Sequence, residues 1–432
     1  MSLYLFLVLC IAVGVQGRPE EGESKHWALI VAGSKGYRNY RHQADACHAY
    51  QIMLKHGIPE ERIVLMMYDD IAHNQRNPTP GVLINHPKGP DVYGGVKIDY
   101  REKDVSARNF LNVLLGKQES MKGIGSGKVI NSGPNDHVFV NFVDHGGQGV
   151  IAFPNSILSA RRLNKAIMQM YREKRYKQMV FYVEACESGS MFGIYFPKNI
   201  NVYATTAAGE AEASFAIYYS NKYHTYLGDV YSVKWMEDSD AYQENLKTET
   251  LQKQYTLVKK ETTTSHVQEF GNKASIWPTV TVLSGIVKQD ARLTTTPSLS
   301  QMDAVPSGDV PMAILRHRLV DTNDFDEKMA IVDEMKLLLE NYQVIRRTVR
   351  EIVTLAIRDD RLVDHVLNER RQLSDFACYE PTLEMFHEMC FNLGENEYAL
   401  RQLYVLANLC EEGISPVDIV QSIVTVCNGS FL

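Results

Sequence analysis

Excess positive charge is missing from the sequence, and so are basic clusters interleaved with aromatic residues. Acidic residues outnumber basic ones by 52 to 45, which gives a formal net charge of -7. Because phosphate binding needs a basic face, nucleic acid is not an expected partner. Long hydrophobic runs are scarce as well. The apolar run from Leu3 to Val15 is too short to cross about 30 Å of hydrocarbon, and no other segment is apolar enough, so no membrane span is expected.

Cysteine is scarce over most of the chain. Cys10 lies in the N-terminal apolar run, and Cys47 and Cys186 are the only other cysteines in the first three hundred residues. An unpaired cysteine in a secreted protein is either buried or reactive. Four more cysteines crowd the C-terminal end, which suggests two disulfides with three arithmetically possible pairings: Cys378, Cys390, Cys410 and Cys427.

The first residues predict a secretory signal peptide. Residues 1–17 hold the apolar run and end in small residues, and the charged stretch RPEEGE follows, although no Lys or Arg precedes the run. We expect residues 1–17 to be removed and residues 18–25 to form a short N-terminal propeptide. The destinations that this allows are a lysosome or other acidic endosomal compartment, a gut lumen, or secretion.

The region from Trp27 to about Val287 alternates short apolar runs with helical periods. This alternation is typical of an α/β fold with a mostly parallel sheet that helices cover on both faces. Strands are expected over residues 27–33, 62–70, 136–146, 177–189 and 200–208. Helices are expected over residues 43–57 and 161–176, where apolar residues recur at helical spacing. Residues 77–95, rich in Pro and Gly, predict a surface loop.

The composition changes after residue 287. From Lys288 to Asp309 the chain is rich in Thr, Ser, Pro and Asp without periodicity, which predicts a linker. From Phe325 to Leu432 there are helical periods and no strand signal, with clear helices over 327–342, 383–390 and 397–412. An all-α, disulfide-stapled unit is therefore expected at the C-terminal end. The single N-glycosylation sequon is at Asn428.

Two expected strands end in reactive side chains. One strand runs into Asp144 and His145, and the next runs into Glu184 and Cys186. Because ligands bind at the carboxyl ends of parallel strands, Cys186 and His145 could face each other as nucleophile and base. The backbone N–H groups of Gly146 and Cys186 could then hold the oxyanion of a tetrahedral intermediate. Each residue alone is more often structural, so the prediction rests on their combination.

Motifs from one end of the chain to the other support this interpretation. They are GSKGYRNYRHQADACHAYQ, MMYDDIA, SGPNDHVFVNFVDHGG, YVEACESGSMF, NVYATTAA and TYLGDVYSVKWMEDSD, with the four late cysteines. Together they resemble the legumain family of asparaginyl endopeptidases. The resemblance implies a caspase-like protease domain over 26–287, with Cys186 as nucleophile, His145 as general base and Asn39 orienting the imidazole. It also implies disulfides Cys378–Cys410 and Cys390–Cys427.

The resemblance further implies a pocket for the side chain of asparagine. That side chain offers an acceptor and a donor, so the pocket needs a cation and a carboxylate. Arg41 is the expected cation and Glu184 and Asp229 the expected carboxylates, with His42 and Ser214 near the rim. Aspartate would be repelled while the two carboxylates are ionised, so cleavage after aspartate is expected only at acid pH.

Several residues near this pocket depart from the family pattern. Ala213 and Ile217 stand where family members commonly carry other residues, and the acidic region Glu210 to Glu212 also differs. Preferences at the pocket rim therefore stay open. The aspartate that matches Asp144 is linked in related enzymes with succinimide formation and peptide ligation. The alternative for Asp144 is acceptance of backbone hydrogen bonds at a turn.

The C-terminal region resembles the activation peptide (from 288–323) and the inhibitory, stabilising prodomain (324–432) of the family's zymogens. In that family the tail covers the active site at neutral pH and is released by acid after cleavage at an asparagine. Asn323 occupies the matching place, although it could instead serve as a helix cap. Arg401 resembles the tail residue that approaches the active site. The Arg-rich stretches 345–361 and 368–373 could pair with acids around Cys186, and acid would weaken such pairs.

The expected partners are therefore peptides with asparagine at the cut, the protein's own tail as intramolecular inhibitor, and cystatin-type inhibitors. No cofactor or metal is expected. A lipid-anchor transamidase shares the Cys/His core but would lack this tail and usually carries a membrane span. A catalytically silent binding protein is the second alternative, and the intact Cys186, His145 and Asn39 argue against it.

Overall fold

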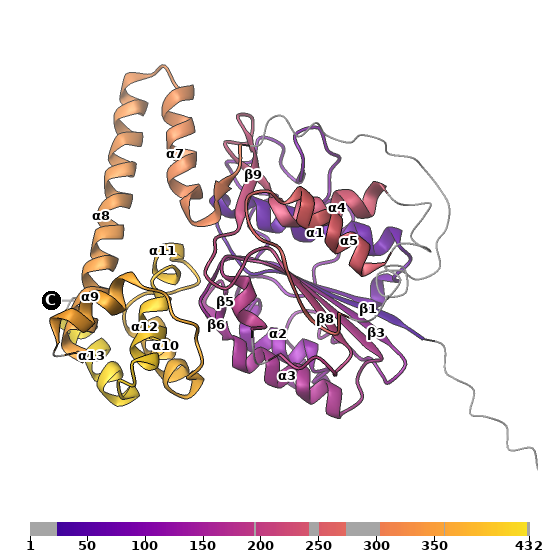
Figure 1. Ribbon diagram of the computed structural model, residues 1–432. Coiled ribbons are helices and arrows are strands. Elements are labelled where there is room, and N and C mark those ends of the chain that lie inside the picture. Colours follow the sequence, from indigo (N-terminus) through magenta and orange to yellow (C-terminus); the bar gives the residue numbers. More distant parts are fainter. Residues whose placement is uncertain (1–23, 194–195, 242–249, 274–302, 358, 430–432) are drawn as a thin grey trace, which may run out of the picture.

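A six-stranded sheet forms the centre of the larger part of the molecule (Figure 1). The strand order is β11–β8–β7–β3–β1–β2. All neighbours are parallel except β11, which pairs antiparallel with β8. The strands are β1 (His26–Ala32), β2 (Ile63–Met66), β3 (His137–Val143), β7 (Gln178–Glu184), β8 (Val202–Thr206) and β11 (Gln268–Gly271). The predicted mostly parallel sheet is confirmed.

This computed structural model describes residues 24–193, 196–241, 250–273, 303–357 and 359–429. The expected signal peptide and most of both the short propeptide and the expected linker lie outside these residues. Within them, strands β2, β3 and β7 end earlier than the sequence predicts. The apolar runs continue into polar residues that leave the sheet, such as Asp144 and Cys186, and these belong to the loops after the strands.

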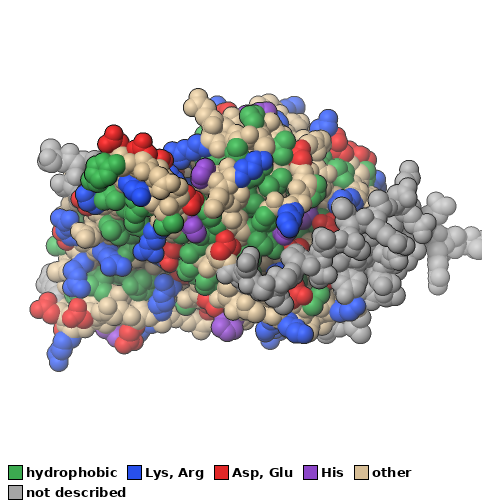
Figure 2. Space-filling view, turned by 90° about the horizontal axis from the view of Figure 1, so that it is seen from above, with side chains coloured by type: hydrophobic (Ala, Val, Ile, Leu, Met, Phe, Trp, Pro, Cys, Tyr) green, Lys and Arg blue, Asp and Glu red, His purple; other side chains and the backbone are tan. Residues whose placement is uncertain are grey.

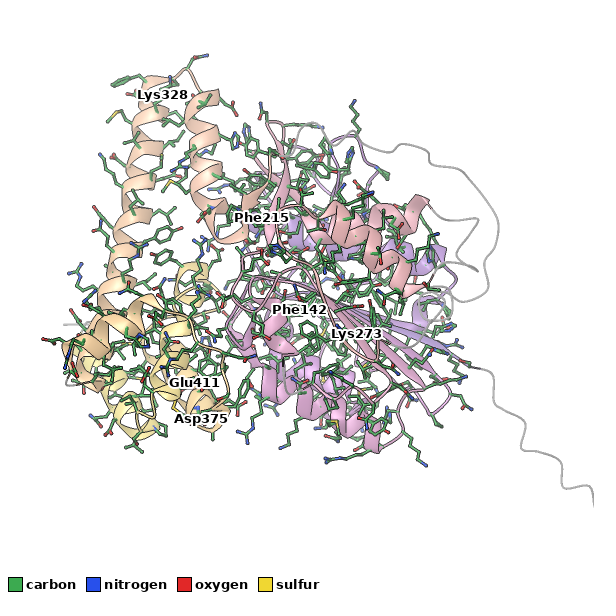
Figure 3. All side chains as sticks on the ribbon, viewed as in Figure 1. Phe142, Phe215, Lys273, Lys328, Asp375 and Glu411 are labelled. Carbon is green, nitrogen blue, oxygen red and sulfur yellow. A yellow bond between two sulfur atoms is a disulfide. The ribbon has the colours of Figure 1, made fainter. Side chains whose placement is uncertain are left out.

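Helices cover both faces of the sheet. On one face lie α1 (Tyr40–Lys55), α4 (Val230–Ala241) and α5 (Leu251–Glu261), and on the other α2 (Ala107–Leu114) and α3 (Ala160–Arg172) (Figure 1). Both faces are packed with buried apolar side chains. Phe142, for example, lies in the interior against Phe110 and Phe153, at centroid distances of 6.4 and 5.3 Å (Figure 3). Burial on both faces explains why the inner strands read as continuous apolar runs.

Two small antiparallel sheets flank the carboxyl edge of the large one. The first joins β4 (Gly146–Gly147), β5 (Val150–Phe153) and β6 (Ser156–Ser159). The second has the order β10–β9–β12, from β9 (Phe215–Ser220), β10 (Thr225–Asp229) and β12 (Val305–Pro306). Strand β12 comes from the expected linker. The prediction of a structureless linker up to Asp309 is therefore wrong at its C-terminal end.

The C-terminal part is helical, as predicted. A long hairpin of α7 (Val310–Asp321) and α8 (Phe325–Ala356) projects above a cluster of shorter helices (Figure 1). These are α9 (Asp360–Asn368), α10 (Phe376–Met389), α11 (Glu397–Leu400), α12 (Leu403–Glu411) and α13 (Pro416–Gly429). Disulfides Cys378–Cys410 and Cys390–Cys427 tie α10 to α12 and α13, with the pairing that the resemblance implies. None of the described helices has the length and apolarity needed to span a membrane.

Candidate active site

The register of two central strands brings the candidate nucleophile and base to one edge of the sheet. Strands β3 and β7 pair in parallel, with Val143 opposite Glu184. His145 and Cys186 each follow two residues later, so both leave the sheet at the same point. Both side chains are buried, with 3% and 7% of their surface exposed. The structure thus places together the two strand ends that the sequence singles out.

His145 is oriented by an asparagine at the start of α1. Its Nε2 lies 3.0 Å from Oδ1 of Asn39, whose own Nδ2 donates to the carbonyl of Lys35. Because the Asn39 oxygen can only accept, Nε2 carries the ring proton and Nδ1 keeps its lone pair for another proton. Burial lowers the pKa of His145, although Glu397 acts in the opposite direction. The ring is therefore neutral at neutral pH and able to act as a base.

Cys186 is held as a thiol in this form of the protein. Its Sγ lies 3.6 Å from Oγ of Ser214. Burial raises the pKa of the Cys186 thiol, although the hydrogen bond with Ser214 and the charge of Arg401 act in the opposite direction. Because the thiolate is the nucleophilic form, the covered site is poorly reactive.

The backbone around Gly146 comes very close to that of Cys186. A Cβ added at Gly146 would lie 2.4 Å from the carbonyl oxygen of Cys186, so only glycine fits this position. The two backbone segments therefore lie close enough for the N–H groups of Gly146 and Cys186 to share one concavity, as an oxyanion hole requires.

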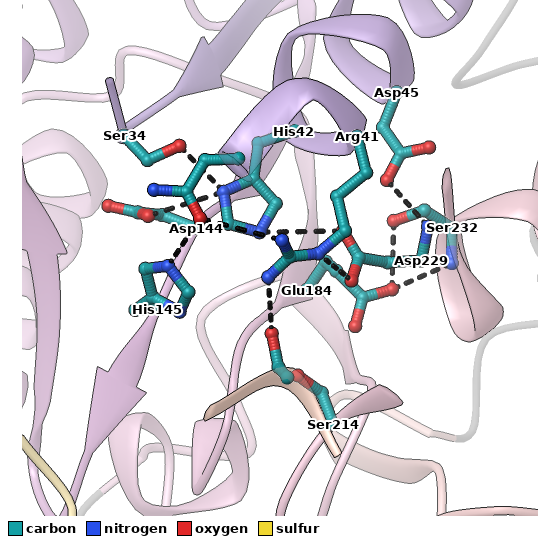
Figure 4. Close-up of polar contacts among 12 residues, drawn as sticks. Ser34, Arg41, His42, Asp45, Asp144, His145, Glu184, Ser214, Asp229 and Ser232 are labelled. Atoms are coloured by element: carbon teal, nitrogen blue, oxygen red, sulfur yellow. Dashed lines mark hydrogen bonds and ion pairs between the residues drawn. The ribbon is translucent and has the colours of Figure 1, made fainter. Parts of the chain in front are cut away.

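Arg41 is the centre of the candidate pocket (Figure 4). Its Nε donates to Oδ1 of Asp229 at 2.9 Å, and the guanidinium is fully buried. Glu184 lies beside this pair, and its Oε2 accepts from the backbone and hydroxyl of Ser232 at 2.8 and 2.9 Å. Its second oxygen, Oε1, accepts no hydrogen bond from the part of the chain that the structure describes. The pocket therefore offers a fixed cation and a free carboxylate oxygen.

His42 lies deeper than the rim, where the sequence places it, and its Nε2 is 3.5 Å from Oδ2 of Asp229 in the candidate pocket. It is 1% exposed, and its Nδ1 lies 2.7 Å from Oγ of Ser34 and 3.5 Å from Asp144 (Figure 4). Its ring meets that of His145 edge-on, with centroids 4.9 Å apart. The first turn of α1 faces the sheet, so Arg41 and His42 both point inward. Burial lowers the pKa of His42 well below its usual value, and the ring is a neutral support.

A third buried acid, which sequence reasoning missed, supports the pocket from behind. Asp45 accepts from the backbone of Asp229 at 3.1 Å and from Nδ2 of Asn85 at 2.6 Å. Burial and the neighbouring Asp229 raise the pKa values of both Asp45 and Glu184 well above the usual range. The spacing of Asp45 four residues after Arg41, on one helix face, is the signal that could have found it.

The candidate pocket is filled by the chain itself. Strand β12 lies antiparallel on β9, with Val305 opposite Ala216, and the backbone of Ser307 donates to the carbonyl of Ser214 at 2.8 Å. The hydroxyl of Ser307 accepts from Arg41 at 2.6 Å. Ser214 is 1% exposed beneath this segment. Ser307 was not predicted, because it lies in a stretch without periodicity.

A second tail residue, Glu397, contacts His145, the candidate base. Oε1 of Glu397 lies 3.2 Å from Nε2 of His145 and 3.3 Å from Nε of Arg38. Burial raises the pKa of Glu397. The His145 ring and the guanidiniums of Arg38 and Arg41 outweigh this effect and hold the pKa at about 2. Glu397 is thus a buried, ionised carboxylate on the candidate base.

Arg401 also lies at the junction, as the resemblance implies, and pairs with Asp309 at 2.8 Å. This pair joins the tail to the segment that fills the pocket. A Cβ added at Gly308 would lie 2.9 Å from Nε of Arg401, so the chain passes close beneath the guanidinium.

The charge pattern of the junction differs from the prediction. Of the Arg-rich stretches, Arg370 pairs with Glu187 beside Cys186 at 2.8 Å, whereas Arg350 pairs within the tail at 3.7 Å. Burial raises the pKa of Glu187 to about 7, against the lowering effect of Arg370. The other cross-junction pairs have the opposite polarity, with the cation on the larger part: Lys35–Glu395, Arg38–Glu397 and Arg161–Glu380. The prediction of an arginine face over an acidic site is therefore wrong for most pairs.

The remaining predicted residues lie apart or have no partner that defines a role. Asn323 is exposed in the turn between α7 and α8, and Asn428 is exposed near the end of α13. Asp144 is buried, and its Oδ1 lies 3.5 Å from Nδ1 of His42. Burial raises the pKa of Asp144 well above its usual range. Ile217 is buried in β9, and Ala213 is partly exposed.

One group of described side chains has the geometry to hold a metal ion. His42, Asp144 and His145 bring one ligand atom each within 4.8 Å of one another. Thiol-based acyl transfer needs only a nucleophile, a base and an oxyanion site, so the chemistry requires no such ion.

Comparisons with known proteins match nearly the whole length of the chain. The Peptidase C13 family model matches residues 26–283, and the legumain prodomain model matches residues 333–427. The legumain of Homo sapiens is 49% identical and covers 100% of this chain and 99% of its own length. The vacuolar-processing enzyme beta-isozyme of Arabidopsis thaliana is 40% identical and covers 95% and 87%. The caspase-1 structure from Spodoptera frugiperda aligns over 62% of this chain and 92% of its own, with TM-score 0.36 and 8% identity.

Proposed function

The chain belongs to the peptidase C13 family and is an asparaginyl cysteine endopeptidase made as a zymogen, in which we propose that Cys186 is the nucleophile and His145 the base. Residues 26–287 are the protease domain in this proposal, and residues 324–432 the inhibitory prodomain. The observation that carries it is the register of β3 and β7, which brings His145 and Cys186 to one edge beside Asn39.

The reaction follows from the hydrogen-bond pattern. With the tail removed, Nδ1 of His145 takes the proton of the Cys186 thiol, and the sulfur attacks the scissile carbonyl carbon. The backbone N–H groups of Gly146 and Cys186 stabilise the oxyanion. The imidazolium then gives its proton to the leaving amine, which leaves a thioester on Cys186. Water, deprotonated by His145, hydrolyses the thioester and restores the thiol.

Specificity for asparagine comes from three buried groups. Arg41 donates to the side-chain carbonyl, and Glu184 and Asp229 accept from the amide. Asp45 holds the backbone of Asp229 at 3.1 Å, so it is a positioning residue. Aspartate in the pocket would place another carboxylate beside these acids and must be protonated to bind.

Latency comes from the tail. Ser307 occupies the Arg41 pocket, and Glu397 lies on His145. Activation requires cleavage near Asn323 and acid-driven release of the prodomain. We place this step in an acidic endosomal or lysosomal compartment, reached through the signal peptide over residues 1–17, or in a gut lumen.

Two finer activities belong to the same proposal. Peptide ligation is the same acyl transfer with an amine replacing water, and Asp144 is the residue proposed for its succinimide route. Cystatin-type proteins are proposed inhibitors, because the uncovered β9 edge can accept an extended segment, as it accepts β12.

A direct experiment tests the proposed function. The purified zymogen is acidified and assayed with Ala-Ala-Asn and Ala-Ala-Asp fluorogenic reporters, beside a Cys186→Ala control. We expect Cys186-dependent turnover of the Asn reporter only after acidification. For the Asp reporter, kcat/KM should fall by about tenfold per pH unit above the carboxyl pKa of the substrate. Absence of Cys186-dependent turnover would refute the proposed protease activity. If kcat/KM for the Asp reporter did not change with pH, the proposed asparagine pocket would be refuted.

A further inference from the structure

The segment that fills the pocket makes one contact that lies well away from Cys186. Asp303 places its carboxylate on the backbone of β9. Oδ1 accepts from the N–H of Tyr218 at 3.0 Å, and Oδ2 accepts from the N–H of Tyr219 at 2.6 Å. Charge-assisted bonds of this kind are stronger than neutral ones.

The backbone of β9 is shaped for this contact. Tyr218 has φ +64°, in the left-handed region that non-glycine residues rarely adopt. The ladder between β9 and β10 pairs Tyr219 with Tyr226 and Ile217 with Gly228, and it does not include Tyr218. Successive N–H groups in such a kink point to one side and form an anion-binding concavity. The two donors are therefore a feature of the protease part, held by its own strand.

Side chains from both the protease part and the tail lie around this concavity. The ring of Tyr219 stacks on His317 of α7, with centroids 3.7 Å apart, so departure of α7 uncovers this side of β9. The hydroxyl of Tyr218 donates to Glu237 at 2.9 Å, and Glu237 in turn pairs with Lys234 at 2.9 Å. The acid near the site is thus paired with a cation.

The bound segment runs in the direction of a substrate. Ser307 lies in the Arg41 pocket, where the asparagine before the cut would lie. Counting back along the chain, Pro306 and Val305 pair with β9. Ala304 packs with the apolar cluster of Ile217 and Val230. Asp303 is then four residues before the pocket residue.

We infer that β9 carries an extended substrate subsite, formed by the N–H groups of Tyr218 and Tyr219, which takes an acidic side chain four residues before the asparagine at the cut. The inference rests on the proposed function, because it assigns the segment's direction to the substrate. Asp303 occupies the subsite in the zymogen, and an acidic substrate uses it in the activated enzyme. A contact made equally in the bound substrate and in the transition state lowers KM without changing kcat, and we expect this contact to be of that kind.

Matched reporters on the activated enzyme provide the test. They share the sequence X-Ala-Val-Pro-Asn before the fluorophore, with Asp, Glu, Asn or Ala at X. We expect kcat/KM to be about fivefold higher for the Asp reporter than for the Asn reporter. The difference should come from a lower KM. It should shrink at 1 M salt, because salt screens the charge of the aspartate. Equal kcat/KM for Asp, Asn and Ala would overturn the subsite while leaving the proposed function intact. If no reporter were cleaved, the proposed function would fail instead.

A binding measurement separates the subsite from turnover. The blocked peptides Asp-Ala-Val-Pro-Ser and Asn-Ala-Val-Pro-Ser have serine in place of asparagine at the end, so they are not cleaved. Calorimetry gives their affinities for the Cys186→Ala protein from which active enzyme has removed the tail and the segment that carries Asp303. The Asp peptide should bind about fivefold tighter. In the zymogen, Asp303→Asn should speed acid activation, whereas Asp303→Glu, which keeps the charge, should change it less. Equal affinities for the two peptides would overturn the subsite even if no reporter were cleaved.

Discussion

At the scale of single residues, the start of α1 supplies several polar groups of the site. Asn39 orients the imidazole of His145, Arg41 provides the pocket cation, and Asp45 holds Asp229 in place. All are buried, so each must find its partner inside the protein. Packing of one helix against the sheet therefore sets both the base and the specificity pocket.

Glu397 gives latency a pH dependence whose sign can be worked out. Its pKa in the zymogen is about 2, below the usual value of 4.5. The stabilisation that it contributes is fully present above pH 4.5 and is lost as the pH falls toward 2. Glu397→Gln should therefore destabilise the docked tail at neutral pH, by on the order of 3 kcal/mol. The zymogen melting temperature, followed against pH in a Cys186→Ala background, measures the loss.

Glu395→Gln is the matched control for this prediction. Glu395 pairs with Lys35 at the same junction, but its side chain is 47% exposed, and exposed pairs contribute little. Its melting profile should follow that of the parent protein. The prediction fails if Glu397→Gln keeps the melting temperature of the parent at neutral pH, or if the difference between them does not shrink below pH 4.5.

At the scale of elements, β9 is the strand on which substrate and inhibitor compete. The edge of β9 away from β10 pairs with β12 in the zymogen, and after activation the same edge would pair with a substrate segment. The difference between the two occupants lies in one side chain. Serine in the Arg41 pocket lacks the carboxamide that Glu184 and Asp229 could bind.

Ser307→Asn should therefore convert the inhibitory segment into a substrate. The carboxamide would reach the acids of the pocket, and the bond between residues 307 and 308 would lie next to Cys186. On acidification, we expect a new fragment beginning at Gly308, which intact-mass spectrometry detects. Ser307→Ala, which removes the hydroxyl without supplying an amide, should give no such fragment. Absence of the fragment from the asparagine variant would show that the segment is not held in a productive position.

The elements that sequence could predict are those with a local signal. Apolar runs predict the parallel strands, and the polar residues after β3 and β7 point to His145 and Cys186. Strand β12 and helix α7 carry no such signal, because their order depends on contacts with β9 and α8. Ser307 and Glu397 were missed for the same reason. Their roles exist only in relation to Arg41 and His145, which lie far away in sequence.

At the scale of the whole molecule, the hairpin α7–α8 places Asn323 far from the pocket. Phe215 lies near its base and Lys328 near its tip (Figure 3). Hydrophobic side chains are exposed at this end of the molecule (Figure 2), including Val320 at 81% and Phe325 at 73%. The tip is thus presented outward, where another molecule can engage it.

Cleavage at Asn323 should consequently take place between molecules. The 12 residues of α7 span about 18 Å at 1.5 Å per residue, and the segment before α7 occupies the pocket of the same chain. The initial rate of Asn323 cleavage per molecule should rise about tenfold for a tenfold higher zymogen concentration. Gel densitometry over a dilution series measures this rate. A Cys186→Ala zymogen should also be cut at Asn323 by a trace of active enzyme. A half-time independent of concentration would indicate cleavage within one chain.

Both disulfides lie inside the helical tail, and neither joins it to the protease part. Once the chain has been cut at Asn323, the helices after the cut form a separate ligand held together by the disulfides, and mass action governs its return. Crowding of zymogens favours the cut between molecules, whereas dilution favours escape of the severed tail. The volume of the compartment therefore acts on the two steps in opposite directions. Enzyme released from a crowded vesicle into a large lumen would lose the helices that carry Glu397 by dilution, whereas Ser307 would stay attached to the protease part.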